Sequence, residues 1–445
     1  MCLEATPPPS PSVTRRGVLA GAAALAGTVA ASGTAAAAIS STGAASSTGA
    51  ASSTGAASST GAARGERTPA GGDLVIRGGT LLDPATGEVT ENAVVVIERG
   101  TVRAAGREGA VAVPQGAEIL DAHGHWVLPG LVDAHIHLST AAEARDAVRQ
   151  GATSARSGST TFYQDIAVRE LARHSPALAP RLTAAGVFVT PDLGDTVLAD
   201  PDLTPLARLK DGVRSAEALR RVVEVNLARG ADVIKTRVNE RAGLPEQDPL
   251  AQVYSYEQLA EIVAAARRRG KGVLCHSYSE QGCHDAVTAG VRSLEHGAFV
   301  GERTLREMRR RGTYFTPTLT AIAGLAESTN PILAERGRTY LPVLKRAVLA
   351  AHELGVPLAA GTDSSGGTVR PIGREVELMR AAGLSALDAI RTATTGAARL
   401  LGVDRAVGRL ARGYAGDAIL VPGDPLTDVT LLKHPTRVIR AGIPL

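Results

Sequence analysis

Two histidines and an aspartate alternate along one apolar stretch of the chain. Residues 128–138 read Leu-Pro-Gly-Leu-Val-Asp-Ala-His-Ile-His-Leu. Alternate side chains of a strand share a face, so Asp133, His135 and His137 should point one way and the apolar residues between them the other. Two neutral imidazoles that converge at a strand end can bind one divalent cation such as zinc. Surface and core histidines also show this spacing, so the elements that pack nearby must decide its meaning.

The middle of the chain alternates apolar, strand-like runs with helical patterns such as Tyr256 to Arg269 and Leu341 to Leu354. Eight runs are expected, which end at His137, Asp165, Phe188, Thr236, His276, His296, Thr318 and Asp363. Eight strand–helix units predict the α/β class and a (β/α)8 TIM barrel. Catalytic groups of such barrels lie at the C-terminal ends of the strands.

Polar residues fall at these predicted strand ends. They are Asp165, Lys235, His276, His296 and Asp363. Each alone has an ordinary interpretation, such as a buried core histidine, a surface lysine or a helix-capping aspartate. The ordinary interpretations are hard to sustain together, because four histidines, Lys235 and Asp363 stand at the ends of five different strands, which a barrel brings together at one face. The remaining histidines lack this context and are interpreted as surface or structural residues: His123, His125, His174, His284, His352 and His434.

Composition narrows the class of protein. The 445 residues can hold a large barrel and a smaller domain, and the hydrophobic content of 44% is typical of a globular chain. The net charge is only +4, which does not favour a nucleic-acid partner. Three cysteines do not make a disulfide framework, and Cys275 and Cys283 are expected to be reduced and buried.

The first 71 residues read as targeting sequence and linker. Arg15 and Arg16 precede an apolar stretch from Val18 to Ala31 that is too short and too rich in small residues for a convincing membrane span. Residues 1–38 therefore predict a twin-arginine export signal, which would interact with the twin-arginine machinery and send the protein to the cell envelope or outside. Residues 39–71, with four copies of Ser-Ser-Thr-Gly-Ala-Ala, predict a flexible linker.

Strand-like segments flank the barrel region on both sides. Asp73 to Leu82 and Ala93 to Ala105 come before it, and Asp417 to Val421 and Arg437 to Gly442 come after it. They predict one small β-domain built from residues 72–128 and 405–445, around a barrel of residues 129–404.

Several motifs resemble those of the amidohydrolase superfamily, in its branch with two metal ions. Leu-Pro-Gly-Leu-Val-Asp-Ala-His-Ile-His is similar to that family's first-strand motif, and Gly-Ala-Asp-Val-Ile-Lys to its fourth. Ala-Gly-Val-Arg-Ser-Leu-Glu-His-Gly is similar to its sixth, and Ala-Gly-Thr-Asp to its eighth. Within the superfamily, the chain most resembles imidazolonepropionases and Xaa-Pro dipeptidases (prolidases).

The resemblance implies a role for each candidate residue. His135, His137 and Asp363 would hold one zinc ion, and His276 and His296 a second. Lys235 would bridge the two ions as a carbamate formed with carbon dioxide. Asp363 would also carry the proton from the attacking water to the leaving nitrogen. Tyr278, two residues after His276, would stabilise the developing oxyanion, although a packed strand-end tyrosine is the alternative.

The resemblance also implies a substrate class, but two loops differ from the family pattern. Phe188 is followed by Val-Thr-Pro-Asp-Leu-Gly-Asp, where relatives often have a Gly-Gly-His stretch, and Phe162-Tyr163-Gln164-Asp165 stands where an Arg-Asp pair is frequent. The expected activity is hydrolysis of an amide C–N bond, first in an N-acyl amino acid or Xaa-Pro dipeptide. A cyclic amide, an ester or a lactone is the alternative, and a tethered, non-catalytic binding barrel is the alternative from another class. An oligomer is left open.

Overall fold

The computed structural model describes residues 72–194 and 200–445, which adopt an α/β fold. The expected export signal (residues 1–38) and the expected linker (residues 39–71) lie outside the described residues. None of the helices in the described ranges is long and apolar enough to cross a membrane.

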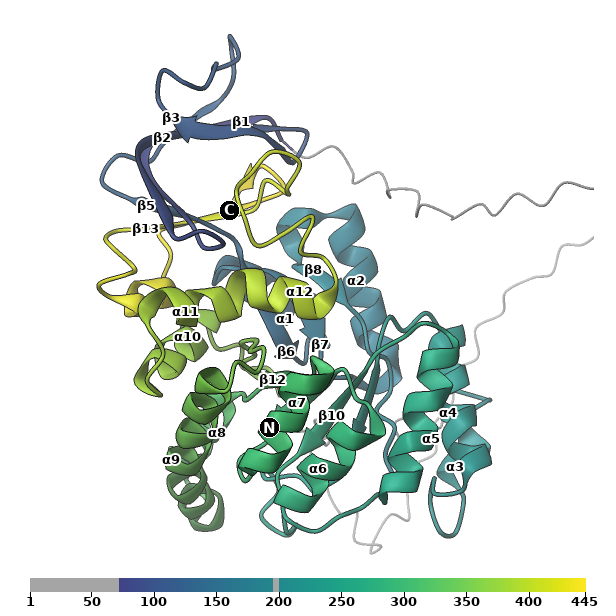
Figure 1. Cartoon of the computed structure of the whole chain (residues 1–445). Coiled ribbons are helices and arrows are strands. Elements are labelled where there is room, and N and C mark those ends of the chain that lie inside the picture. Colours follow the sequence, from purple (N-terminus) through teal and green to yellow (C-terminus); the bar gives the residue numbers. More distant parts are fainter. Residues whose placement is uncertain (1–71, 195–199) are drawn as a thin grey trace, which may run out of the picture. The chain divides into compact units, whose positions relative to one another are not determined.

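Strands from both ends of the described chain lie side by side in one sheet (Figure 1). Its order is β15-β14-β13-β5-β1-β2-β3, and β4 pairs with β1. The strands are β1 (Leu74–Asp83), β2 (Glu88–Glu98), β3 (Thr101–Arg107), β4 (Ile119–Asp121), β5 (Trp126–Pro129), β13 (Ala418–Val421), β14 (Arg437–Arg440) and β15 (Ile443–Pro444). A turn at Arg99 and Gly100, both with positive φ, splits the strand expected over Ala93 to Ala105.

The middle of the chain holds two parallel sheets. Their order is β6-β7-β8 and β12-β11-β10-β9. The strands are β6 (Leu131–Ile136), β7 (Ala152–Ser157), β8 (Arg181–Thr183), β9 (Ile234–Arg237), β10 (Val273–Ser277), β11 (Ser293–His296) and β12 (Tyr314–Thr316). The two sheets do not close into one ladder, so the predicted barrel stays a prediction.

Backbone hydrogen bonds nevertheless join an edge strand of each sheet to a segment outside the strands. The amide of Val189 donates to the carbonyl of Lys235 at 2.9 Å, and the amide of Ala134 donates to the carbonyl of Ala360 at 2.8 Å. The eighth strand, expected to end at Asp363, is represented only by a single parallel bridge between Phe315 and Leu358. The segment before Asp363 thus lies beside β12 and β6 without a regular ladder of its own.

Two predicted strand ends are wrong. The second strand ends at Ser157, and Asp165 lies instead in the first turn of α2. Its buried carboxylate accepts hydrogen bonds from the amides of Ala185 and Gly186 at 2.7 and 2.9 Å, so this residue fixes a loop rather than facing the site. The third strand, β8, ends at Thr183, before Phe188.

Helices follow most of the parallel strands. They are α1 (Ala141–Arg149), α2 (Gln164–His174), α3 (Thr204–Ala207), α4 (Ala216–Ala228), α5 (Tyr256–Arg268), α6 (Glu280–Ala289), α7 (Glu302–Arg311), α8 (Leu319–Ala326), α9 (Pro331–Glu353), α10 (Ile372–Ala381), α11 (Ala386–Arg391) and α12 (Ala397–Leu401). The helix expected from Leu341 begins ten residues earlier. Asn330 caps it and Pro331 occupies its first turn, where a missing N–H costs nothing.

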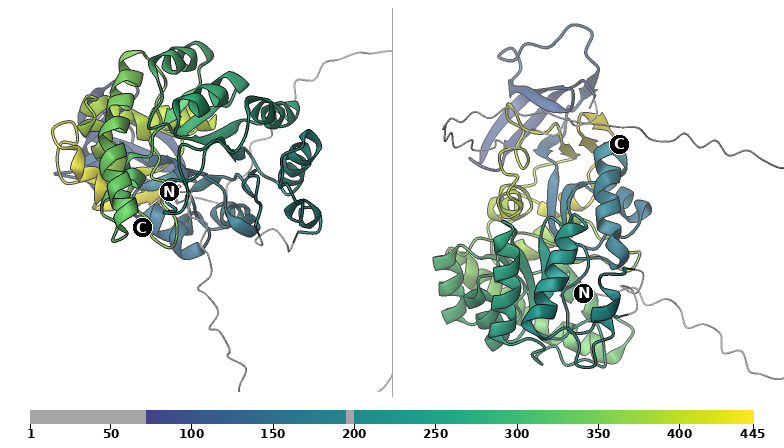
Figure 2. Two further views of the ribbon diagram at one scale, coloured as in Figure 1. Left: turned by 90° about the horizontal axis from the view of Figure 1, so that it is seen from below. Right: turned by 90° about the vertical axis from the view of Figure 1, so that its right-hand side faces the viewer.

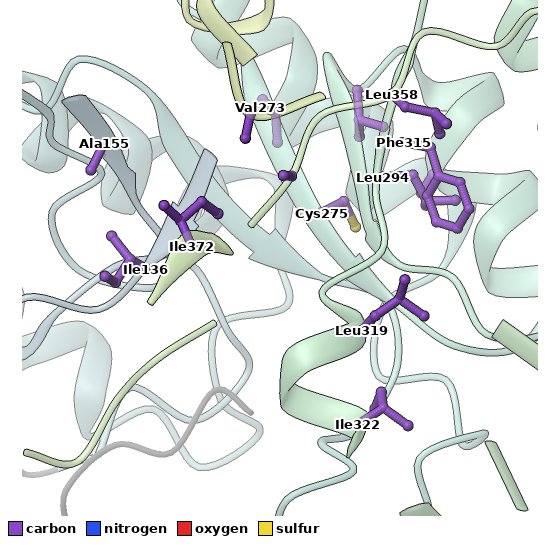
Figure 3. Close-up of a cluster of buried hydrophobic side chains, with 14 of the residues drawn as sticks. Ile136, Ala155, Val273, Cys275, Leu294, Phe315, Leu319, Ile322, Leu358 and Ile372 are labelled. Atoms are coloured by element: carbon purple, nitrogen blue, oxygen red, sulfur yellow. The ribbon is translucent and has the colours of Figure 1, made fainter. Parts of the chain in front are cut away.

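The main core lies between the parallel strands and these helices. The teal and green helices lie on the outer side of the strands (Figure 2). Figure 3 shows part of the buried cluster, with Leu294 of β11 and Phe315 of β12 beside each other. Cys275 belongs to the same cluster, and both it and Cys283 are buried free thiols, as expected. Packing on the outer faces leaves the inner faces and strand ends to polar side chains.

Candidate metal centre and active site

His135 is fully buried on β6 and is held between two carboxylates. Its Nδ1 lies 2.6 Å from Oε2 of Glu295. Because an ionised carboxylate only accepts, Nδ1 carries the proton and Nε2 keeps its lone pair. Nε2 lies 3.1 Å from Nζ of Lys235 and 3.5 Å from Oδ1 of Asp363. The lone pair of His135 therefore faces the same space as the lysine and the aspartate.

His137 follows the last residue of β6 and points its Nε2 toward the same aspartate. Its Nδ1 lies 2.6 Å from the carbonyl oxygen of Ser159, which can only accept, and its Nε2 lies 3.1 Å from Oδ1 of Asp363. One ligand atom from each of His135, His137 and Asp363 lies within 4.8 Å of the other two. Two imidazole nitrogens and a carboxylate oxygen are donors that zinc and similar divalent cations prefer.

His276 and His296 continue the cluster from β10 and β11. Their ring centroids are 4.5 Å apart, and the His296 ring lies 5.3 Å from that of His135. Nε2 of His276 lies 3.0 Å from the carbonyl of Glu240, so this nitrogen carries the proton and Nδ1 keeps a lone pair. The Thr318 hydroxyl donates to the Pro317 carbonyl, so it accepts from Nδ1 of His296 at 2.6 Å. Each ring therefore uses one nitrogen for this hydrogen bond, and its other nitrogen is the one that could bind a cation.

Lys235 and Tyr278 complete the set of predicted site residues. The Lys235 side chain is fully buried, and its Nζ lies 5.5 Å from the centre of the Phe188 ring. Tyr278 is 1% exposed, and its ring stacks on His296 with centroids 5.2 Å apart and an interplanar angle of 13°. The structure thus brings together every metal-ligand candidate and Tyr278, although they come from five separate parts of the chain.

Three residues of the site have left-handed backbone. The φ angles are 68° at His296, 52° at Thr318 and 52° at Asp363. Such conformations cost about 1–3 kcal/mol each for residues other than glycine, and they persist only where the surroundings enforce them. Asp363 is held by its amide, which donates to the carbonyl of His135 at 2.7 Å. Strain concentrated at the strand ends is typical of a functional site.

A buried ion pair below the cluster supports His135. Arg156 of β7 donates from Nη2 to both carboxylate oxygens of Glu295 at 2.9 and 3.1 Å, and from Nε to the carbonyl of Ala134. Burial alone would raise the pKa of Glu295, but Arg156 and His135 outweigh it and lower the pKa from 4.5 to about 2. The ionised carboxylate therefore stabilises the fold above about pH 4.5, and this contribution is lost as the pH falls toward 2.

Gly158 tests whether the cluster fits a metal ion. A Cβ at this position would lie 2.6 Å from Nε2 of His135 and 2.6 Å from Nε2 of His137. The space that both lone pairs face is therefore open only because residue 158 lacks a side chain. A space of this kind, bordered by two imidazoles and a carboxylate, fits a divalent cation.

Replacing Gly158 by alanine should lower zinc affinity at least about tenfold, because the new methyl group would fill the space between the two imidazoles or push both imidazoles aside. Zinc content after equal loading and dialysis measures the effect, with the melting temperature of the metal-free protein as a folding check. Gly106→Ala is the matched control, since its Cβ would meet only Cγ2 of Val111 at 3.2 Å. If Gly158→Ala bound as much zinc as the wild type, the space beside Gly158 would not be the metal site.

Sequence reasoning missed the residues that orient the ligands. Glu295, Arg156 and Thr318 hold His135 and His296 in place, and the Ser159 carbonyl holds His137. Only Glu295 had a local signal, since it directly precedes His296. The set of three ligands found in the described residues contains none of the six histidines interpreted as surface or structural.

Comparison with known proteins identifies the family. The model of the amidohydrolase family matches residues 126–443, which includes every residue of the cluster. The chain belongs to the amidohydrolase family. This confirms the resemblance inferred from the strand-end motifs. The family generally binds divalent metals, in agreement with the cluster of His135, His137 and Asp363.

Individual relatives agree with this assignment. The chain is 27% identical over 403 residues to the ochratoxinase of Aspergillus niger, covering 80% of this chain and 83% of that enzyme. The crystal structure of A. niger ochratoxinase has a TM-score of 0.71 and covers 84% of this chain and 95% of that one. A Xaa-Pro dipeptidase with methionine bound in its active site has a TM-score of 0.75 at 24% identity, covering 84% of this amidohydrolase and 99% of that chain. At this identity the likeness of the two structures shows a shared fold.

Proposed function

We propose that this amidohydrolase is an exported, metal-dependent enzyme that hydrolyses the amide C–N bond of a small substrate. The observation that carries the proposal is the set of buried His135, partly buried His137 and buried Asp363, whose ligand atoms all lie within 4.8 Å of one another. Family membership and the similarity to an ochratoxinase support hydrolysis of carbon–nitrogen bonds. An N-acyl amino acid or an Xaa-Pro dipeptide is the first substrate choice, which the dipeptidase-like fold also supports.

Two divalent cations, with zinc as the first choice, would occupy the cluster. His135, His137 and Asp363 would hold one, and His276 and His296 the other. Lys235 would bridge them after carbon dioxide converts its amine into a carbamate, because a carbamate is anionic and offers two oxygens while an amine offers one nitrogen. Bound cations would lower the pKa of water toward neutrality and polarise the substrate carbonyl.

Side chains of the protein, and not the cations, would carry out the proton transfers. Asp363 accepts the proton of the attacking water and passes it to the leaving nitrogen, which becomes a neutral amine. Tyr278 donates a hydrogen bond to the carbonyl oxygen as that oxygen gains negative charge. Its backbone amide donates to Oδ1 of Asn239 at 2.9 Å, which holds the start of its loop in place.

The arrangement of these residues is best explained by a (β/α)8 barrel over residues 129–404. In this proposal, the segments around Val189 and Ala360 take the place of the two strands that would close the barrel between the two parallel sheets. Their hydrogen bonds to Lys235 and Ala134 support this closure. Residues 72–128 and 405–445 then form the second, smaller domain.

A substrate screen tests the function. Zinc-loaded enzyme is offered a library of N-acyl amino acids and dipeptides, with cyclic amides, esters and lactones as the alternative classes. Release of a free amine from at least one acyclic amide is the expected result. Turnover of esters or cyclic amides alone would contradict the acyclic-amide proposal. A chain that binds less than one zinc ion and turns over nothing would be a non-catalytic binding barrel.

Export through the twin-arginine pathway is part of the proposal and rests on the sequence of residues 1–38. The receptor of that pathway recognises the arginine pair as the targeting signal. Replacing Arg15 and Arg16 by lysine should leave the full-length precursor inside the cell, with its activity preserved in lysates. Immunoblots of cell and exported fractions measure this. Unchanged secretion would remove the signal assignment.

A further inference from the structure

A buried arginine lies on the same strand as Lys235, two residues nearer to the C-terminal end of that strand. Arg237 is two residues after Lys235 on β9, so both side chains point to the same side of the strand. Arg237 is 4% exposed. Its Nε donates to Oγ1 of Thr190 at 2.8 Å, and its Nη1 pairs with Glu240. The positive charge of Arg237 is therefore already balanced by one acid.

A second arginine, Arg241, lies in the loop that follows β9, and no ion pair with an acid is found for it within the described ranges. Arg241 directly follows Glu240, whose carbonyl lies 3.0 Å from Nε2 of the site residue His276. The Nε of Arg241 is buried and has no hydrogen-bond partner among the described residues. The charge of Arg241 is close enough to lower the pKa of Arg237, which burial lowers first. Glu240 thus serves as the acid of Arg237, whereas within the described residues no acid is found paired with Arg241, the residue next to the carbonyl that faces His276.

The loop that carries Arg241 is held in a defined position. The amide of Arg241 donates to Oε1 of Gln247 at 2.9 Å. Arg336 of α9 donates to the carbonyls of Ala242, Leu244 and Gln247 at 2.5, 3.0 and 2.9 Å. A rigid loop lowers the entropy cost of holding the guanidinium toward a ligand. A partly buried guanidinium without an acid costs desolvation energy unless a ligand supplies the anion.

We propose that Arg241, with Arg237 beside it, binds a carboxylate of the substrate. The substrate class is then an amide that carries a free carboxylate near the scissile bond, as in an N-acyl amino acid. A guanidinium presents its donors in a planar fork that matches the two oxygens of a carboxylate. The inference rests on the proposed amide hydrolysis and adds the group by which substrates are selected.

Binding measurements can test the inference without turnover. The probes are N-methanesulfonyl derivatives of phenylalanine, leucine and proline. In these compounds a sulfonamide replaces the scissile amide bond. The matched uncharged probes are the carboxamides of the same compounds, in which an amide replaces the free carboxylate. Calorimetric titration of the zinc-loaded wild type should show at least one acid binding about tenfold or more tightly than its carboxamide. Arg241→Gln should weaken that acid about 10- to 100-fold and leave the carboxamide within about threefold, because a hydrogen bond to a charged group is removed.

The matched control is Arg269→Gln. Arg269 is exposed and lies four residues before β10, at the end of that strand opposite to His276, so its loss should change neither probe. Equal binding of acid and carboxamide to the wild type would overturn the inference, as would a preference for the acid that survives in Arg241→Gln or a failure of every acid to bind.

The same variants separate this inference from the proposed function. If the wild type hydrolyses amides and Arg241→Gln raises KM for carboxylate substrates alone, with kcat little changed, both proposals hold. Hydrolysis without any carboxylate preference overturns only the inference. Carboxylate-selective binding by Arg241 without hydrolysis of any amide overturns only the proposed function.

Discussion

Replacing Asp363 by asparagine is expected to lower kcat by at least about 10²-fold, because a positioned proton carrier is worth roughly 10²–10⁴-fold in rate. Oδ1 of Asp363 lies 3.1 Å from Nε2 of His137 and 3.5 Å from Nε2 of His135. Asparagine keeps the shape and one oxygen donor, and it tolerates the left-handed backbone that Asp363 adopts at φ 52°. The loss should therefore fall on proton transfer and leave folding and most of the metal in place.

Zinc content, kcat and the pH profile should be measured on one preparation of Asp363→Asn. KM should change less than kcat, since the interaction lost is one made in the transition state. The acidic limb of the wild-type kcat/KM profile should disappear or move. Asp211→Asn, which removes an exposed carboxylate, serves as the control and should match the wild type. Near-wild-type kcat with full metal content would leave Asp363 as a structural ligand only.

Replacing Lys235 by alanine should remove at least one metal ion and most of the activity. The side chain is fully buried, and its Nζ lies 3.1 Å from Nε2 of His135, inside the space assigned to the cations. An ammonium group there would repel two divalent cations, whereas a carbamate would neutralise part of their charge. Without the bridge, mutual repulsion of the cations should expel one of them.

Chemical rescue distinguishes the carbamate from a structural role of the lysine. The truncated side chain leaves a cavity in which acetate or propionate can supply two carboxylate oxygens, so either should partly restore metal content and turnover. Lys235→Arg keeps a positive charge but does not form this carbamate, and it should lose metal as Lys235→Ala does. Lys210→Ala removes an exposed lysine and should change nothing. Two zinc ions and normal turnover in Lys235→Ala would show that the carbamate is not needed.

Local patterns in the sequence were enough to single out residues that the structure brings together. His135 and His137 alternate along one strand, and a period of two places them on one side whatever surrounds the strand. His276 and His296 each occur near the end of a short apolar run, which is a strand signal that needs no tertiary information. The side-chain faces of these strands are local properties, so they could be predicted.

Other predictions from the sequence were wrong because tertiary contacts outweigh the local sequence pattern. Asp165 resembled a strand-end residue, but its carboxylate is bound by the amides of Ala185 and Gly186, and this contact places it in the first turn of α2. The segment before Asp363 has an apolar, strand-like sequence, yet it forms only one bridge, to Phe315. In both cases a partner far away in the sequence decides the hydrogen bonding.

The sequence by itself determined which residue types are available as candidate ligands and in which motifs they stand, and hence the family. Only the tertiary structure decided which nitrogen of each histidine faces the site. Glu295 is 160 residues from His135, and its carboxylate accepts the Nδ1 proton at 2.6 Å. Thr318 does the same for His296. The open space beside Gly158 and the buried Nε of Arg241, which has no hydrogen-bond partner in the part of the chain that the structure describes, likewise depend on long-range packing, because burial and hydrogen bonding are set by the neighbours that folding assembles.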